Sequence, residues 1–258
     1  MSRISEAFKK EKAFIAFITG GDPDLETSYE LIKTMAENGA DIIEIGIPFS
    51  DPIAEGPVIQ EADIRALNAG TTTDALFDLV SRLRKEIEIP LVFMTYMNPV
   101  YVYGIDKFLK RCAEVGIDGI IVPDVPFEEK ADLAEDCKKN GIDLISMIAP
   151  TSLERIETIA KEAEGFIYCV SSLGVTGVRS EITTDIGSMV KHVKNVTDVP
   201  VAVGFGIATP EQAKKMAGLS DGAIVGSAIV KLVATYGKDA VPYVADYVKS
   251  MKAGVLEA

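Results

Sequence analysis

Residues 13–39 read AFIAFITGGDPDLETSYELIKTMAENG and contain one complete strand–loop–helix unit. The apolar run at 13–19 predicts a strand that is covered on both faces, as in a parallel sheet. Glycine, aspartate and proline at 20–24 end this strand, and we expect a helix at 27–38 that is closed by Gly39. A chain that repeats this unit builds an α/β fold around a parallel sheet.

The same unit recurs through the rest of the sequence. Further strands are predicted at 42–45, 91–95, 119–122, 144–148, 166–170, 201–203 and 223–225. Helices are predicted at 73–85, 106–115, 128–139, 153–162, 185–193, 210–217, 228–236 and 240–252. A Gly-x-Asp motif precedes three of these strands, starting at Gly39, Gly116 and Gly141.

The number of units favours one architecture. Eight strands that are each followed by a helix fit a single (β/α)8 TIM barrel with an extra N-terminal helix at 2–10. An open doubly wound sheet is the alternative, but it needs no eighth strand. No linker is visible, so we expect one domain over residues 1–258.

Composition and charge exclude several classes of protein. The net charge of −13 repels phosphate polyanions, so neither nucleic acid nor an anionic membrane surface is an expected partner. No apolar run approaches the length of about 18 residues that a membrane-spanning helix needs. Residues 1–12 are polar and of mixed charge, without the apolar centre of a secretory signal, so we expect a cytoplasmic protein.

Histidine and cysteine are scarce. His192 is the single histidine, and we expect it on the surface of a helix among charged residues. No histidine-based triad or histidine-rich metal site can therefore form, and no metal is expected. The three cysteines show no Cys-x-x-Cys spacing and are expected to be buried apolar residues, at Cys112, Cys137 and Cys169. Acid–base chemistry is left to carboxylates, tyrosine or lysine.

Residues 41–57, DIIEIGIPFSDPIAEGP, carry a carboxylate on a predicted strand and two more in the loop that follows. If Glu44 points into the barrel, Ile42 and Gly46 share its side, and Phe17 is a candidate neighbour. A carboxyl among apolar side chains has a raised pKa, whereas a loop carboxylate in water stays ionised. The stretch therefore suits paired acid and base work, unless Glu44 is only a wetted residue at the barrel mouth.

The loop acids have two interpretations. Proline and glycine around Glu55 restrict the backbone and can hold its carboxylate over the barrel mouth, although a loop acid is more often a solvated charge. Asp51 is expected to brace the loop or to bond a neighbouring loop.

Three glycine-bearing loops follow the last three predicted strands. They read SSLGVTG at 171–177, GFGIATP at 204–210 and GSA at 226–228. Backbone N–H groups and a helix N-terminus at adjacent strand ends form the phosphate site of many barrels. The alternative is that these glycines only serve turns that need positive φ.

These motifs together carry a family resemblance. In order along the chain, the stretches that match are 20–23, 44–57, Asn68, 96–99, 124–126, Tyr168, 174–177, 204–206 and 226–231. The chain resembles the tryptophan synthase alpha subunit family over nearly its whole length. The resemblance implies retro-aldol cleavage of indole-3-glycerol phosphate into indole and glyceraldehyde 3-phosphate, in tryptophan biosynthesis.

The resemblance also implies roles for residues. Glu44 would be the proton shuttle, Glu55 would face the indole N–H group, and Tyr168 would line the same pocket. Glu55 stands where the family normally has aspartate, which lengthens the reach of this carboxylate by one methylene group. The substrate-binding residues would be Phe17 and Phe205 beside the indole ring, Asp51 and Thr176 around the loop acid, and Gly177, Gly206, Gly226 and Ser227 at the phosphate.

The resemblance implies no cofactor for this chain, because the protonated indole ring is itself the electron sink. The partner would be the tryptophan synthase beta subunit, which carries pyridoxal phosphate, in an α2β2 complex. The loop after the second strand and the region of Asn98 would face that partner. Two alternatives remain: a weakly catalytic subunit that mainly binds and activates the beta subunit, and another phosphate-binding barrel enzyme.

Overall fold

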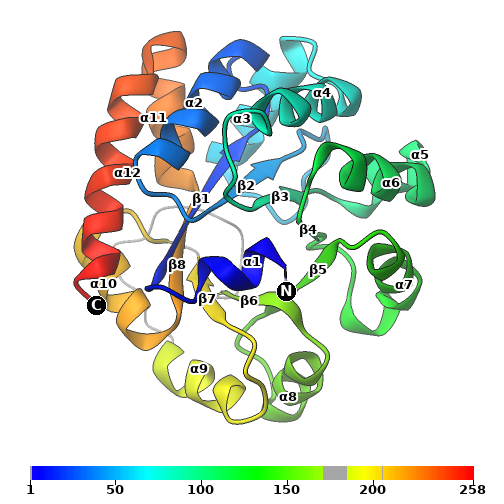
Figure 1. The fold of residues 1–258 in the computed structure, drawn as a ribbon, viewed down its shortest axis with the longest axis vertical. Coiled ribbons are helices and arrows are strands. Elements are labelled where there is room, and N and C mark those ends of the chain that lie inside the picture. The colour runs from blue at the N-terminus through cyan, green and yellow to red at the C-terminus, as the bar shows by residue number, and fades with distance from the viewer. Residues whose placement is uncertain (1, 171–184, 205) are drawn as a thin grey trace.

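The computed structural model of the chain describes residues 2–170, 185–204 and 206–258. In Figure 1 the described strands form a closed parallel barrel that runs in order from β1 to β8, with β8 paired to β1. The strands are β1 (Ala13–Thr19), β2 (Ile42–Gly46), β3 (Leu91–Met94), β4 (Gly119–Ile121), β5 (Asp143–Ile148), β6 (Glu164–Val170), β7 (Val201–Gly204) and β8 (Gly222–Val225). The predicted (β/α)8 barrel is confirmed, and the open sheet is excluded.

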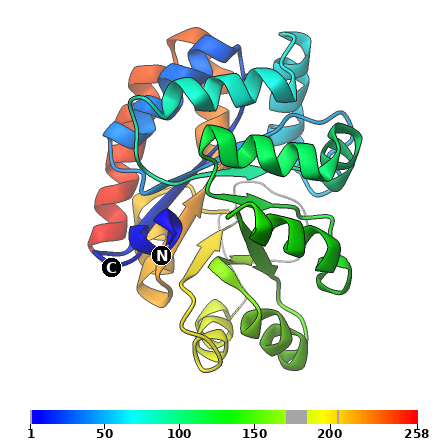
Figure 2. The ribbon, with the colours of Figure 1, turned by 45° about the vertical axis from the view of Figure 1, so that its right-hand side comes forward.

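Helices surround the barrel, as Figure 2 shows from a second direction. The described α-helices are α1 (Arg3–Ala7), α2 (Leu25–Glu37), α3 (Pro57–Asn68), α4 (Thr73–Leu83), α5 (Met97–Tyr103), α6 (Ile105–Val115), α7 (Ala131–Lys139), α8 (Leu153–Lys161), α9 (Ile186–Lys194), α10 (Pro210–Leu219), α11 (Ser227–Tyr236) and α12 (Val241–Leu256). Two short 3-10 helices are η1 (Phe127–Glu129) and η2 (Gly237–Asp239).

Side chains alternate between the barrel interior and the helical layer. Ile42 belongs to the interior cluster, together with Ile15 and Val92 from the neighbouring strands. Ile43 and Ile45 instead pack in the larger cluster that joins the barrel to the helices. The alternation along β2 is therefore as predicted, and it turns Glu44 inward.

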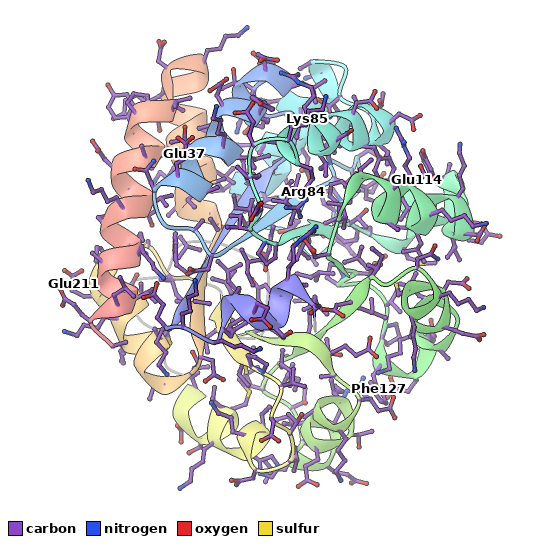
Figure 3. All side chains as sticks on the ribbon, viewed as in Figure 1. Glu37, Arg84, Lys85, Glu114, Phe127 and Glu211 are labelled. Atoms are coloured by element: carbon purple, nitrogen blue, oxygen red, sulfur yellow. The ribbon has the colours of Figure 1, made fainter. Side chains whose placement is uncertain are left out.

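Aspartates that precede three strands fix the strand beside them. Asp41, Asp118 and Asp221 each accept a hydrogen bond from a backbone N–H group of the preceding strand, donated by Phe14, Leu91 and Val201 at 2.6, 2.9 and 3.0 Å. Asp118 also binds the guanidinium group of Arg84, a residue labelled in Figure 3, at 2.5 Å. The Gly-x-Asp motifs at 39–41 and 116–118 thus bond adjacent strands at their N-terminal ends.

The N-terminal helix closes one end of the barrel. Ile4 on α1 is fully buried and packs in the interior cluster with Ile15 and Phe166. Arg3 pairs with Asp118 at 2.9 Å, at the N-terminal end of β4. Figure 1 shows α1 lying across this end. The opposite end, where the strands have their C-termini, is left for the site.

Two of the described helices, α3 and α5, were not predicted from the sequence, so the prediction is corrected here. The pattern of residues 46–72 predicts no helix, but α3 begins directly after Gly56 with Pro57 in its first turn. Proline is compatible with that position, because its missing N–H group has no helical partner there. Helix α5 was likewise not predicted. The N–H group of Met97 at its start donates a hydrogen bond to Asp124 at 2.9 Å.

Cysteine and histidine positions complete the comparison with the sequence. The three cysteines are buried free thiols, as predicted. His192 on α9 is half-buried, and its Nε2 lies 3.1 Å from Oε1 of Glu157 on α8, so it is less solvated than expected. Among the helices that the structure describes, none is long and apolar enough to cross a bilayer.

Candidate active site

Glu44 is a buried carboxyl inside the barrel. Strand β2 pairs it with Phe17 on β1 and Val92 on β3. Its side chain is fully buried, and neither carboxyl oxygen has a hydrogen-bond partner among the described residues. Burial, and secondarily the charge of Glu55, raises the pKa of Glu44 to about 8. Glu44 therefore carries a proton near neutral pH, and it is not a wetted residue at the barrel mouth.

Glu55 is held in place by its own loop and by two neighbouring elements. Its N–H group bonds the carbonyl of Pro52 at 3.1 Å, and its carbonyl accepts a hydrogen bond from the side chain of Gln60 at 2.7 Å. The preceding N–H group, of Ala54, donates to the hydroxyl of Tyr96 at 3.0 Å. Glu55 is only 6% exposed. The loop acid is therefore a fixed group and not a solvated charge.

Tyr168 on β6 lies close to both acids. It is almost fully buried, and its pKa is raised well above its usual value by burial and then by the charges of Glu44 and Glu55. Its ring covers the end of β7, where a Cβ atom on Gly204 would come within 2.5 Å of the Tyr168 hydroxyl oxygen. The structure thus brings the three predicted catalytic residues together at one end of the barrel.

Phe17 lies opposite Glu44 on the neighbouring strand. Its ring occupies space that a side chain on Gly46 would fill, since a Cβ atom there would lie 2.8 Å from Cζ of Phe17. A Cβ atom on Gly226 would lie 3.2 Å from Cβ of Phe17. Glycine at the ends of β2 and β8 therefore lets Phe17 reach a position between the barrel and α3, where it packs on Ile59.

The predicted phosphate residues that are described lie at the ends of β7 and β8. Gly206 is buried and adopts a φ of +79°, a conformation that favours glycine, and its contact with a phosphate stays a prediction. Gly226 has a negative φ and caps α11, which begins at Ser227 without a side-chain cap. The first N–H groups of α11 are thus available to an anion. Thr176, Gly177 and Phe205 lie outside the described residues.

Asp51 is separate from these groups. Its side chain is exposed, and its carboxylate accepts a hydrogen bond from the hydroxyl of Ser50 at 2.5 Å. This contact fits the bracing role that the sequence suggested. Its participation in substrate binding stays a prediction.

Two residues near Glu55 were not predicted as part of the site. Tyr96 packs on Phe49 with ring centroids 5.6 Å apart and holds the loop through Ala54. Asp63 on α3 is 5% exposed, and burial and secondarily the charge of Glu55 raise its pKa to about 8. A signal for Asp63 was present, because it shares the apolar face of residues 57–68, and an acid on such a face is unusual.

Comparisons with known proteins agree with this geometry. Residues 4–255 match the family model described as tryptophan synthase alpha chain. The tryptophan synthase alpha chain of Lacticaseibacillus casei is 49% identical over 255 residues, which cover 99% of this chain and 96% of that protein. The same protein from Thermoanaerobacter sp. (strain X514) is 49% identical over 259 residues, with 98% and 99% covered.

Solved structures give the same result. The tryptophan synthase subunit alpha of Legionella pneumophila str. Paris superposes with a TM-score of 0.90 at 35% identity, covering 99% of this chain and 98% of that chain. A chain of Mycobacterium tuberculosis tryptophan synthase superposes with a TM-score of 0.90 at 33% identity, with 99% and 98% covered. By sequence and by structure, the chain belongs to the tryptophan synthase alpha chain family.

Proposed function

We propose that this chain cleaves indole-3-glycerol phosphate into indole and glyceraldehyde 3-phosphate, with Glu44 as its acid–base group. The observation that carries the proposal is the state of Glu44, a fully buried acid with a pKa of about 8 in the middle of barrel strand β2. A general acid works best when its pKa lies near the operating pH. An unpaired buried carboxyl costs stability, so its retention needs a functional reason.

The reaction can be written with its protons balanced. Protonated Glu44 delivers its proton to C3 of the indole ring, which leaves a positive charge shared with the ring nitrogen. The carboxylate of Glu44 then takes the proton of the adjacent glycerol hydroxyl. The carbon–carbon bond breaks, its electron pair returns to the ring, and the hydroxyl carbon becomes the aldehyde. Glu44 ends protonated, as it began.

Glu55 and its neighbours would stabilise the charged intermediate. A carboxylate opposite the ring N–H group offsets the positive charge that protonation of C3 creates. The loop contacts through Tyr96 and Gln60 hold Glu55 before substrate arrives, so little reorganisation is needed. Tyr168 and Phe17 would form the walls of the pocket on either side of the ring.

The phosphate would bind at the ends of β7 and β8. The first N–H groups of α11, beginning at Ser227, point their positive dipole end toward this position. Gly206 and Gly226 let the backbone approach the anion closely. Local backbone groups can thus bind a phosphate although the whole chain carries a net charge of −13.

A face beside this pocket suits the beta subunit as a partner. Ile53 in the loop after β2 and Tyr101 and Val102 on α5 are 78%, 72% and 77% exposed. Large apolar side chains with that exposure are typical of residues that a partner covers. We propose that this face docks the beta subunit in an α2β2 complex, and that the protein works in the cytoplasm.

A second function remains a candidate because of the same face and because of Glu55. The longer side chain can misplace the carboxylate, and an error of about 1 Å can cost on the order of a hundredfold in rate. The protein would then be a weak lyase that mainly binds and activates the beta subunit.

Indole formation from indole-3-glycerol phosphate distinguishes the two functions. For a working lyase we expect turnover that rises with the beta subunit, and a loss on the order of a hundredfold in Glu55→Gln, which removes the charge and keeps the size. The matched control is Glu61→Gln, an exposed residue on α3, and it should be neutral. Turnover near the wild-type rate in Glu55→Gln contradicts the role of Glu55. No turnover, with the beta subunit still stimulated, favours the second function.

A further inference from the structure

Helix α3 follows directly on the loop that carries Glu55, yet apolar packing holds this helix only lightly. Its buried residues are one isoleucine, two alanines and one aspartate, namely Ile59, Ala62, Ala66 and Asp63. Alanine side chains bury little apolar area, so they fix the orientation of a helix weakly. The orientation of α3 therefore depends on its polar contacts.

One polar contact joins α3 to the loop after β1. The guanidinium group of Arg65 donates a hydrogen bond to each carboxylate oxygen of Asp22, both at 2.8 Å. The side chain of Asp22 is 1% exposed, and that of Arg65 is 32% exposed. A planar guanidinium group that binds a carboxylate at two points fixes a direction as well as a distance. This contact can therefore orient the helix that carries Arg65.

Asp22 is itself held from the other side. The hydroxyl group of Ser28 on α2 donates to the carbonyl of Asp22 at 3.3 Å and accepts a hydrogen bond from the N–H group of Gly21 at 2.8 Å. Thr71, which follows α3, packs on the same loop, because a Cβ atom on Gly21 would lie 2.0 Å from the Thr71 hydroxyl oxygen. The loop after β1 is thus a fixed anchor point for α3.

The first turns of α3 contact both Glu55 and Phe17. The side chain of Gln60 donates a hydrogen bond to the carbonyl of Glu55 at 2.7 Å. Ile59 packs on Phe17, which lies opposite the buried acid of β2. A change in the tilt of α3 moves both contacts, and an error of about 1 Å at a catalytic group can cost on the order of a hundredfold in rate.

We propose that Arg65 is a positioning residue: it holds α3 on Asp22, and α3 in turn sets where the Glu55 loop lies. The effect on turnover rests on the proposed lyase function, whereas the effect on the loop does not. A buried ion pair adds little net stability compared with apolar residues of the same volume, so the geometry that this pair fixes is the better reason for its presence.

Turnover of Arg65→Lys gives the first test. Lysine keeps the positive charge and loses the two-point contact. We expect kcat to fall on the order of tenfold with little change in KM, because Glu55 acts on the charged intermediate and not on bound substrate. The matched control is Arg82→Lys, since Arg82 on α4 also binds both carboxylate oxygens of one acid, Glu26, at 3.0 Å. The control should keep the wild-type kcat.

A double variant covers the case in which Arg65→Lys does not fold. Asp22→Asn combined with Arg65→Gln leaves no buried charge unpaired, and it removes the same two-point contact. We again expect kcat to fall on the order of tenfold. Wild-type kcat in either variant, with folding confirmed by thermal melting, overturns the proposal.

Hydrogen exchange tests the contact without any activity. The N–H groups of Ala54 and Glu55 donate to the Tyr96 hydroxyl and to the carbonyl of Pro52, so their exchange reports how firmly the loop is held. We expect exchange on the order of tenfold faster in Arg65→Lys, and wild-type exchange in Arg82→Lys. Equal exchange in all three proteins overturns the proposal, whatever the turnover. If the wild type forms no indole while Arg65→Lys still loosens the loop, the proposed lyase function fails and the positioning contact stands.

Discussion

Glu44 is a residue whose burial has a cost in stability. Its carboxyl is fully buried and has no hydrogen-bond partner among the described residues. The unfolded chain exposes the same group to water, where its pKa is near 4.5, whereas burial raises the pKa to about 8 in the folded protein. Between these two pKa values, Glu44 keeps its proton in the folded state and has lost it in the unfolded state.

This difference predicts a pH-dependent stability. Between pH 4.5 and 8 the unfolded state is favoured progressively as pH rises, and the loss is complete above the folded pKa. Glu44→Gln removes the ionisable group and keeps the shape of the side chain. The free energy of unfolding of the variant, relative to that of the wild type, should therefore increase by about 3 kcal/mol from pH 5 to pH 8. Urea unfolding followed by circular dichroism measures this, because the chain has no tryptophan.

The control for that comparison is Glu61→Gln on the exposed side of α3, which should show no such growth. An advantage of Glu44→Gln that is equal at pH 5 and pH 8 would contradict the raised pKa of Glu44.

At the scale of elements, glycines at the strand ends leave room for two aromatic side chains inside the barrel. Gly46 ends β2 beneath the ring of Phe17, and Gly204 ends β7 beneath the ring of Tyr168. Both lie close enough that even a methyl group would meet the ring. Part of the glycine-rich pattern thus serves the aromatic walls, in addition to any phosphate contact.

Gly204→Ala tests this assignment. The new Cβ atom would lie 2.5 Å from the hydroxyl oxygen of Tyr168 and must displace it, so we expect a cost of about 1–3 kcal/mol in stability and a fall in kcat. Gly187→Ala on α9 is the matched control, since its Cβ atom meets Leu219 at an ordinary 3.5 Å. Thermal melting should show a lower Tm only for Gly204→Ala. Equal melting temperatures would mean that Tyr168 does not depend on Gly204.

Helix α3 shows where sequence patterns were insufficient at this scale. Proline and glycine around Glu55 indicated a loop, so the helix that begins at Pro57 was not predicted. The apolar spacing of Ile59, Ala62 and Ala66 was available as a signal. The relation of Asp63 to Glu55 was not, because it depends on how α3 lies against the loop, which no local pattern specifies.

For the whole molecule, repetition made the barrel predictable. Each of the eight strands was located from an apolar run, and the alternation along β2 correctly turned Glu44 inward and Ile43 outward. The proximity of Glu44 and Glu55 to Tyr168 came only from the family resemblance and the structure, since these residues lie far apart in the sequence and only the folded barrel brings their charges within reach of one another. Thr176, Gly177 and Phe205 fall outside the described residues and stay predictions.

The central claim is that Glu44 donates the proton that starts carbon–carbon cleavage. The most direct measurement is turnover of indole-3-glycerol phosphate in D2O near neutral pD, with the beta subunit present, by the wild type and by Glu44→Gln. We expect deuterium at C3 of the indole that the wild type releases, and a rate for Glu44→Gln that is lower on the order of a thousandfold. Indole formation by Glu44→Gln at a rate close to that of the wild type would contradict the account.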